Sequence, residues 1–457
     1  MGPASPGPGP ADPDRHPRDR LVRTLSLSDA TLLVVSSVIG SGIFLAPREI
    51  ASQLPHAGLI LAAWTAGGLL SLAGALANAE LGAMYPHAGG NYVYLREAFH
   101  PVAGFLVGWL GFFVIFAGTI ATLAVGFAES VSGGLELGAG GTTGIAVAVT
   151  VLFSALNWVG VRWGALVNNL SAVLKVLALL AFAVGAPLAG AVSLEHVGPL
   201  VAGAASAAPL VAFGLALSPV LFSYLGWNAP VFVASEIRDP ARNVPRSLFL
   251  GLAICTLVYL LVNAVYLAAL PIPELREVPN AGEATARVVF GERGGSLVAG
   301  FVLLSILGTL NATILVGPRI AYAMALDGRF FGGVDRVNAS YRTPEVAIAV
   351  QALTAVALIL GLESFRNTLN YTTFAVVIAT IADVAALYAL RRRAPLRPRP
   401  YRAFGYPWLP ALYIVANLAI AAALLVGSPR ECAIGLAMLA SGLPFYLLFR
   451  RGARARA

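Results

Sequence analysis

The sequence predicts an all-α integral membrane protein, and three observations lead to that class. Hydrophobic residues make up 58% of the 457 residues and charged residues only 11%, whereas an ordinary soluble domain carries about 25% charged residues. The apolar residues fall in runs of about 20, the length of a helix that crosses a bilayer. The basic residues gather in alternate connections between these runs, as expected for a membrane protein. A soluble multidomain enzyme is excluded.

We predict twelve transmembrane helices, because twelve apolar runs have the length of a span. They cover residues 29–51, 58–79, 101–127, 143–161, 165–185, 209–235, 247–270, 296–325, 344–361, 368–390, 406–426 and 432–449. An even number of spans places both termini on one side of the membrane. Most arginines then lie on that side, which is therefore predicted to be cytoplasmic. The exceptions are Arg48, Arg276, Arg287, Arg293, Arg366 and Arg430.

The connections and tails follow from this topology. Residues 1–23, rich in Pro and Gly, and residues 451–457 are predicted to be cytoplasmic tails, the first of them disordered. Residues 393–404 form a basic cytoplasmic loop. We expect the arginines of 391–402 to set the topology and to contact lipid headgroups. The plasma membrane, in a bacterium the inner membrane, is the expected location.

Charge and reactive residues exclude further classes. The formal net charge is +8, but the positive residues do not cluster on a soluble face, so we expect no nucleic-acid partner. Lys175 is the only lysine and is followed by Val176, so no phosphate-binding loop GxxxxGK[ST] exists. The two cysteines, Cys255 and Cys432, and the five histidines show no metal-ligand spacing. We therefore expect no metal, no cofactor and no catalytic residue.

The first and sixth spans are each interrupted by helix-breaking residues. The first contains VIGSGIF at residues 38–44, and the sixth contains FSYLGWNAP at residues 222–230. Gly40, Gly42 and Gly226 weaken the helix, and proline removes a hydrogen-bond donor. Helices 1–5 and 6–10 run in opposite senses because five is odd. Matching breaks in two such halves are typical of inverted-repeat transporters, with the binding site at the midplane; the alternative is that the glycines only permit close helix packing.

Interrupted helices also suit one class of substrate. Unwound backbone is tolerated inside a membrane only where it lines a cavity or is buried in protein. Free N–H groups at the start of a half-helix favour an anion, and free C=O groups at the end of one favour a cation. An amino acid zwitterion offers one group of each sign.

Three motifs carry a family resemblance. They are VIGSGIF followed by Pro47, the segment FSYLGWNAPVFVASEIRDPARNVPRSL at 222–248, and the segment GTLNATILVGPRIAYAMALDG at 308–328. Together they resemble the amino acid–polyamine–organocation superfamily, and most of all bacterial relatives of its L-type, neutral amino acid transporters. The resemblance covers nearly the whole chain in order. It implies the leucine-transporter fold, with two inverted five-helix repeats at 24–190 and 200–392 and two further helices at 405–450.

The resemblance also implies where the substrate binds. The carboxylate would meet the amides and hydroxyl around Ser41 and Gly42, and the amino group would meet backbone carbonyls of helices 1 and 6. Phe222 stands where the family has an aromatic gate, and Asn228 where a polar residue approaches the substrate. Leu225 stands where many relatives have a second glycine, so the side-chain preference of the pocket is open. The implied substrate residues are Val38, Ser41, Gly42, Phe222, Ser223, Leu225 and Asn228.

Lys175 lies near the middle of the fifth span, about 10 residues or ~15 Å from either end, too far for its side chain to reach the membrane surface. A charge at such a position costs about 2.5–3.5 kcal/mol and marks a functional site. In the resembling family a lysine here lies between helices 1 and 8, where sodium-coupled relatives bind an ion. The resemblance thus implies sodium-independent transport, with Ser305 or Thr309 and the backbone near Ser36 and Ser37 as partners. The alternative is a lysine in a water-filled vestibule.

Acidic residues are sparse inside the spans. Asp383 in the tenth span is the clearest, and its role is open. Glu80, Glu129 and Glu236 stand at span ends, where a solvated or capping role is expected, and 236–246 is a charged turn that is either a gate or a solvated loop. No acid lies beside the predicted pocket, which favours a neutral amino acid over arginine or a polyamine.

We therefore predict transport of neutral L-amino acids by alternating access, sodium-independent and by exchange or uniport. Two alternatives stay open: a proton-coupled symporter of amino acids or organocations in which Lys175 or Asp383 titrates, and a membrane sensor that binds an amino acid without moving it. The outer loop 128–142 contains no cysteine, so we expect no disulfide-linked heavy chain. The oligomeric state is open.

Overall fold

The computed structural model describes residues 17–135, 138–197, 207–361, 365–427 and 429–454, and helices dominate these ranges. Within them no β-strand occurs, and two isolated bridges join Leu25 to Ile237 and Ala88 to Val233. The first helix begins at a capping box, in which Ser26 and Asp29 each bind the other's backbone N–H. The predicted all-helical class is confirmed.

The helices have the following bounds. They are α1 (Leu27–Val38), α2 (Gly42–Gln53), α3 (Ala57–Met84), α4 (Asn91–Ala98), α5 (Pro101–Leu110), η1 (Gly111–Phe116), α6 (Ala117–Leu135), α7 (Ala139–Trp158), α8 (Val161–Leu188), α9 (Leu194–Val197), α10 (Ala207–Ser223), α11 (Ala229–Phe232), η2 (Ala234–Glu236), α12 (Pro240–Ala269), α13 (Ile272–Leu275), α14 (Ala281–Val316), α15 (Pro318–Leu326), α16 (Glu345–Gly361), α17 (Phe365–Arg393), α18 (Trp408–Gly427) and α19 (Pro429–Arg454).

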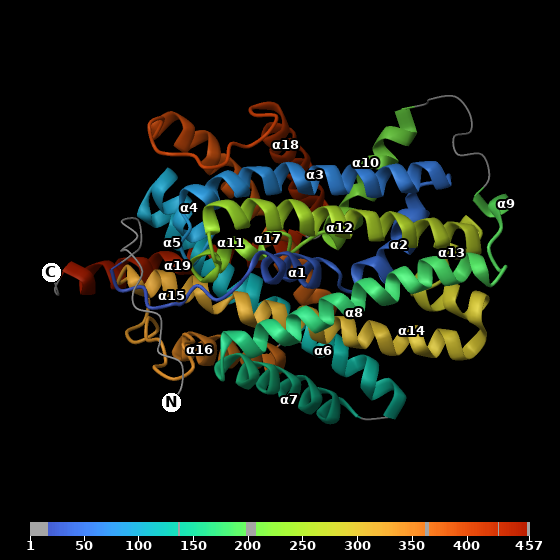
Figure 1. Ribbon diagram of the computed structural model, residues 1–457, viewed down its shortest axis with the longest axis horizontal. Helices are drawn as coiled ribbons and strands as arrows, with labels where there is room; N and C mark the ends of the chain where they lie inside the picture. Colours follow the sequence, from blue (N-terminus) through green and yellow to red (C-terminus); the bar gives the residue numbers. More distant parts are fainter. Residues whose placement is uncertain (1–16, 136–137, 198–206, 362–364, 428, 455–457) are drawn as a thin grey trace, which may run out of the picture.

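Nine helical stretches in the described ranges are long and apolar enough to cross a membrane. The pair α1 and α2, bent by 46° at its break, is a tenth candidate, and Ala212–Ser223 and Glu345–Gly361 are apolar but shorter. The long helices α3, α8, α12 and α14 run along the long axis of the molecule, with α4 and α15 at one end and α9 and α13 at the other (Figure 1). The chain is thus a multi-span membrane protein.

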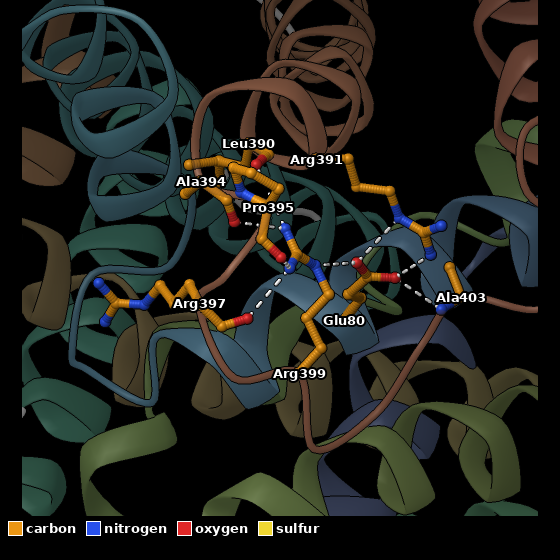
Figure 2. A network of polar contacts seen from close by, with 8 residues as sticks. All are labelled: Glu80, Leu390, Arg391, Ala394, Pro395, Arg397, Arg399 and Ala403. Carbon is orange, nitrogen blue, oxygen red and sulfur yellow. Dashed lines mark hydrogen bonds and ion pairs between the residues drawn. The ribbon is translucent and has the colours of Figure 1, made fainter.

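The basic loop after α17 folds back onto α3. Glu80, which is 0% exposed, binds Arg391 Nη2 at 2.6 Å and Arg399 Nε at 3.2 Å through its two carboxylate oxygens. It also accepts the backbone N–H of Ala403 at 2.7 Å. Figure 2 shows both guanidinium groups converging on this carboxylate, while the side chain of Arg397 points away from it. The expected headgroup contact is therefore wrong for Arg391 and Arg399, and the expected solvated or capping role is wrong for Glu80.

A second buried ion pair lies at the same end of the molecule. Glu236 accepts two hydrogen bonds from Arg319 of α15, at 2.7 and 3.1 Å, and both side chains are 1% exposed. The backbone of the neighbouring Ile237 segment is bonded to Leu25, through Leu25 N to Glu236 O at 2.9 Å and Arg238 N to Leu25 O at 2.8 Å. The expected solvated role of Glu236 is therefore wrong, because its carboxylate is buried. The two hydrogen bonds from the guanidinium of Arg319 compensate for the water that the buried carboxylate has lost.

Candidate substrate site

The break in the first span separates α1 from α2 by three residues, Ile39 to Ser41. Phe44 N and Leu45 N donate to the carbonyl of Ser41 at 3.1 Å each and so close the first turn of α2. The N–H groups before that turn have no helical carbonyl to bind. Ser41 occupies the N-cap position, and its side chain makes no capping hydrogen bond. The start of α2 can therefore bind an anion.

The break in the sixth span begins after Ser223, where the chain leaves α10 and turns through 224–228 before α11. Gly226 has a φ of +98°, and a Cβ there would lie 2.8 Å from the carbonyl oxygen of Ser37. A Cβ on Gly42 would lie 2.6 Å from Ser223 Oγ. Both positions therefore require glycine, and the two breaks touch each other. Gly40 is different, because its Cβ would make only an ordinary contact with Thr309.

A cavity of about 180 Å³ lies between the two breaks. Its described lining includes no Asp, Glu, Lys or Arg. All the substrate residues expected from the sequence line it, together with the three glycines of the breaks and Thr309. Lys175 and Ser305 do not line it. The predicted residues in the lining are Val38, Gly40, Ser41, Gly42, Phe222, Ser223, Leu225, Gly226 and Asn228.

The far wall of the cavity comes from helices that sequence reasoning did not assign to the site. The chain from α5 to α6 passes through the π-helical segment η1, whose Ile115 and Phe116 reach the cavity. Such segments occur often at functional sites. The other lining residues of α6, α14 and α17 are mostly small or hydroxylated, and threonines inside apolar spans are the sequence signal that could have found them. They are Thr119, Thr122, Leu123, Ala312, Thr313, Val316, Thr372, Val376, Ala379 and Thr380.

Tyr259 of α12 joins the two broken helices. Its hydroxyl lies 2.8 Å from the carbonyl oxygen of Val38 and 2.9 Å from that of Ser223, the last residues of α1 and α10. The family resemblance led us to expect these carbonyls to face the substrate amino group, and no sequence motif pointed to Tyr259. Each carbonyl oxygen has a second lone pair, so a bond from Tyr259 leaves room for another donor.

Lys175 reaches the end of α1 from α8. Its ammonium donates to the carbonyls of Ser36 and Ile39, at 3.0 and 2.7 Å, and to Thr309 Oγ1 of α14 at 2.9 Å. Ser305 Oγ also donates to Ile39 O, at 3.2 Å. A positive charge at a helix C-terminus is favourable. The structure thus brings Lys175, Ser305 and Thr309 together around α1, and a side chain 1% exposed does not suit a water-filled vestibule.

Comparisons with known proteins agree with this architecture. The family model for amino acid permeases matches residues 25–446. The chain is 30% identical to the serine/threonine exchanger SteT of Bacillus subtilis over 436 residues, which is 94% of this chain and 98% of that protein. It is 29% identical to the human large neutral amino acids transporter small subunit 2, covering 94% of this chain and 80% of the other.

A third relative extends the same picture. The rat b(0,+)-type amino acid transporter 1 is 28% identical over 443 residues, covering 94% of this chain and 88% of the relative. All three are transporters, and none is named as an enzyme. The chain therefore belongs to the amino acid permease family of the amino acid–polyamine–organocation superfamily, related to the L-type amino acid transporters.

Proposed function

We propose that this protein exchanges neutral L-amino acids across the plasma membrane by alternating access, without sodium. The observation that carries the proposal is the cavity between the two helix breaks, whose described lining holds no charged side chain. An amino acid zwitterion in it would place its carboxylate on the N–H groups at the start of α2. Its ammonium would lie at the carbonyl ends of α1 and α10, beside Tyr259.

The side chain of the substrate would point toward α6, α14 and α17. A second positive charge on it would need an acid, and no Asp or Glu is in the described lining, so we propose a neutral substrate. Hydroxyls of Thr119, Thr122 and Thr313 suit a small or polar side chain. This preference agrees with the substrates in the name of the relative SteT.

Sodium independence rests on Lys175. In this structure its ammonium places a positive charge between the carbonyl end of α1 and the hydroxyls of α14. A bound cation would otherwise have to supply that charge. A mobile cation bound to the same carbonyls would lie next to the fixed ammonium of Lys175. The two positive charges would then repel each other strongly in a medium of low dielectric constant.

We also propose the arrangement around the site. Twelve spans would form two inverted five-helix repeats at 24–190 and 200–392, with α18 and α19 outside them and both termini cytoplasmic. The second repeat would begin with α10 and end with α17. We further propose that no disulfide-linked heavy chain is required, because 128–142 contains no cysteine.

Counterflow in proteoliposomes tests the proposal. Vesicles loaded with each common amino acid in turn are diluted into a trace of labelled substrate, once in sodium buffer and once in choline buffer. Transient accumulation with neutral amino acids, equal in both buffers, supports the proposal. Binding without counterflow would indicate a sensor, an absolute need for sodium would contradict the role of Lys175, and net uptake driven by a proton gradient without exchange would indicate a symporter.

A further inference from the structure

A second cavity lies where two long apolar helices reach the end of their spans. Its volume is about 540 Å³, and its described lining shares no residue with that of the substrate cavity. Both α3, which ends here, and α12, which begins here, are long and apolar enough to cross a membrane. The cavity therefore lies at the level where the spans leave the hydrocarbon and meet the lipid headgroups. The lining residues from these two helix ends are Ala83, Met84, Pro86, Asp239, Pro240 and Ala241.

Two arginines from opposite ends of the chain complete this cavity. Arg23 comes from the segment before α1, and Arg397 comes from the loop after α17. Asp239 is the one acid in the described lining. With two guanidinium groups and one carboxylate, the ionic side chains of the lining carry a net charge of +1. A cavity of this kind favours a ligand with a single negative charge.

The guanidinium of Arg397 is held by the end of α3. It lies 3.9 Å from the ring centroid of Tyr85, and its Nη2 lies 3.5 Å from the carbonyl oxygen of Met84. Its side chain points away from Glu80 and from the two guanidinium groups bound there (Figure 2). A guanidinium has five N–H donors in one plane. Stacking on a ring leaves the donors at its edge able to bind oxygen atoms of a ligand.

The segment that carries Arg23 is fixed by backbone hydrogen bonds. Leu25 donates to Glu236 O at 2.9 Å and accepts from Arg238 N at 2.8 Å. Arg238 directly precedes Asp239, so these bonds hold Arg23 next to the start of α12. Its guanidinium also has five N–H donors, and a ligand oxygen can bind there in addition to contacts within the protein. Both arginines thus reach the cavity from positions that the fold determines.

The charges and donors of the cavity match a phosphodiester. The N–H pairs of a guanidinium fit the spacing of phosphate oxygens and bind them strongly. A phosphodiester carries one negative charge, which balances the lining. A phosphate monoester carries about −1.5 to −2 at pH 7 and would leave excess negative charge beside Asp239. The carboxylate of Asp239 can accept a hydrogen bond from a hydroxyl of the same ligand.

The loop that carries Arg397 has the character of a membrane surface. Leu396, Phe404 and Trp408, on this loop and at the start of α18, are 96%, 75% and 80% exposed. Side chains of this kind lie well at the boundary between headgroups and acyl chains, where tryptophan is enriched. Leu396 directly precedes Arg397. A lipid packed against these apolar side chains would have its phosphate at the level of the cavity.

We propose that this cavity binds the phosphodiester headgroup of an anionic membrane lipid. Arg23 and Arg397 bind the phosphate oxygens, and Asp239 accepts from a headgroup hydroxyl. The bound headgroup joins the segment before α1, the end of α3, the start of α12 and the loop after α17, and so it stabilises the folded protein. The site does not depend on the proposed transport function, because a protein that fails in counterflow can still bind the lipid.

Thermal unfolding of the full-length protein in a neutral maltoside detergent tests the site. Short-chain dihexanoyl phosphatidylglycerol is titrated, in parallel with dihexanoyl phosphatidylcholine and with inorganic phosphate. Phosphatidylglycerol should raise the unfolding midpoint in a saturable way, and the other two should raise it much less. Absence of a saturable shift would overturn the site. An equal effect of inorganic phosphate would identify a free phosphate as the ligand and overturn the lipid, and an equal effect of phosphatidylcholine would overturn the preference for an anionic headgroup.

Variants locate the binding in the cavity. The double variant Arg23→Gln, Arg397→Gln should raise the half-saturating concentration of phosphatidylglycerol roughly 30-fold, because each arginine near an anionic lipid contributes about fivefold. Arg402→Gln changes an exposed arginine of the same loop outside the described lining and should leave half-saturation unchanged. An unchanged value in the double variant, or an equal loss in Arg402→Gln, would overturn the assignment.

A third variant covers the case in which the double variant does not fold. Ala241→Leu places a larger side chain at the start of α12 and narrows the cavity without changing its charge. It should also raise the half-saturating concentration of phosphatidylglycerol, because the headgroup no longer fits between the two arginines. Half-saturation equal to that of the wild type in a well-folded Ala241→Leu would contradict the site.

Discussion

Replacing Lys175 should reduce transport far more than it reduces stability. Lys175→Met keeps most of the side-chain volume and removes the ammonium, and Lys175→Ala removes both. Two of the three hydrogen bonds of the ammonium reach carbonyls of α1, those of Ser36 and Ile39. The variants therefore detach α1 from α8 while leaving the helices themselves intact.

The magnitude follows from these bonds. A hydrogen bond from a charged group contributes about 1.5–3 kcal/mol. The lower figure applies here, because Thr309 and Ser305 still donate to the same carbonyls. Two bonds thus favour this position of α1 by about 3 kcal/mol, which is roughly a 100-fold change in a conformational equilibrium. Removal of the buried charge returns about 2.5–3.5 kcal/mol to the folded state, so the free energy of unfolding should change little.

The assay combines counterflow in proteoliposomes with thermal unfolding in detergent. Both Lys175 variants should lose most counterflow, and Lys175→Met should keep a midpoint close to that of the wild type. Arg293→Ala, which changes an exposed cation on α14, is the control and should behave as wild type in both measurements. Normal counterflow by a well-folded Lys175→Met would refute the reasoning, as would an equal loss in Arg293→Ala.

Two further substitutions test the contact between the breaks. Tyr259→Phe removes the hydroxyl that binds the ends of α1 and α10. It should weaken substrate affinity by about 1–2 kcal/mol, roughly tenfold. Scintillation-proximity binding measures the affinity, and an unchanged value would contradict the contact. Gly226→Ala places a Cβ 2.8 Å from Ser37 O at a φ of +98° and should cost about 2–4 kcal/mol of stability. Thermal unfolding checks it against Gly214→Ala, which has open space, and equal midpoints would speak against the steric argument.

The parts of the molecule that could be predicted depend on single residues with a strong effect of their own, on the backbone or as a charge inside the membrane. Glycine and proline mark the breaks because they act on the backbone wherever they stand. A lone lysine in an apolar span marks a functional position by itself, but its partners came from the family resemblance, which implied the backbone near Ser36 and Ser305 or Thr309; Lys175 contacts the carbonyl of Ser36 and Thr309. The second carbonyl, of Ile39, was missed.

The parts that could not be predicted depend on contacts between distant segments. Tyr259 is one tyrosine in an apolar helix, and nothing local distinguishes it from a residue that faces lipid. Glu80 stands 311 residues from Arg391, and an acid at the end of a span is usually solvated. The expectation for Glu80 followed the commoner case, and the packing of α3 against the loop after α17 reverses it.

The two sets of bonds at the end of α1 differ in what they hold together. Tyr259 ties α1 and α10 to α12, so both breaks are held to one helix. Lys175, Thr309 and Ser305 tie α1 to α8 and α14. In the proposed alternating-access cycle the bonds of Tyr259 can persist, because they hold both broken helices to the same helix, α12. The bonds of Lys175 to α1 must break if α1 moves away from α8. Water can then solvate both the carbonyls of α1 and the ammonium. A hydrogen bond that is strong when buried, and that water replaces when it is exposed, suits a gate. For this reason loss of Lys175 should affect transport rather than folding.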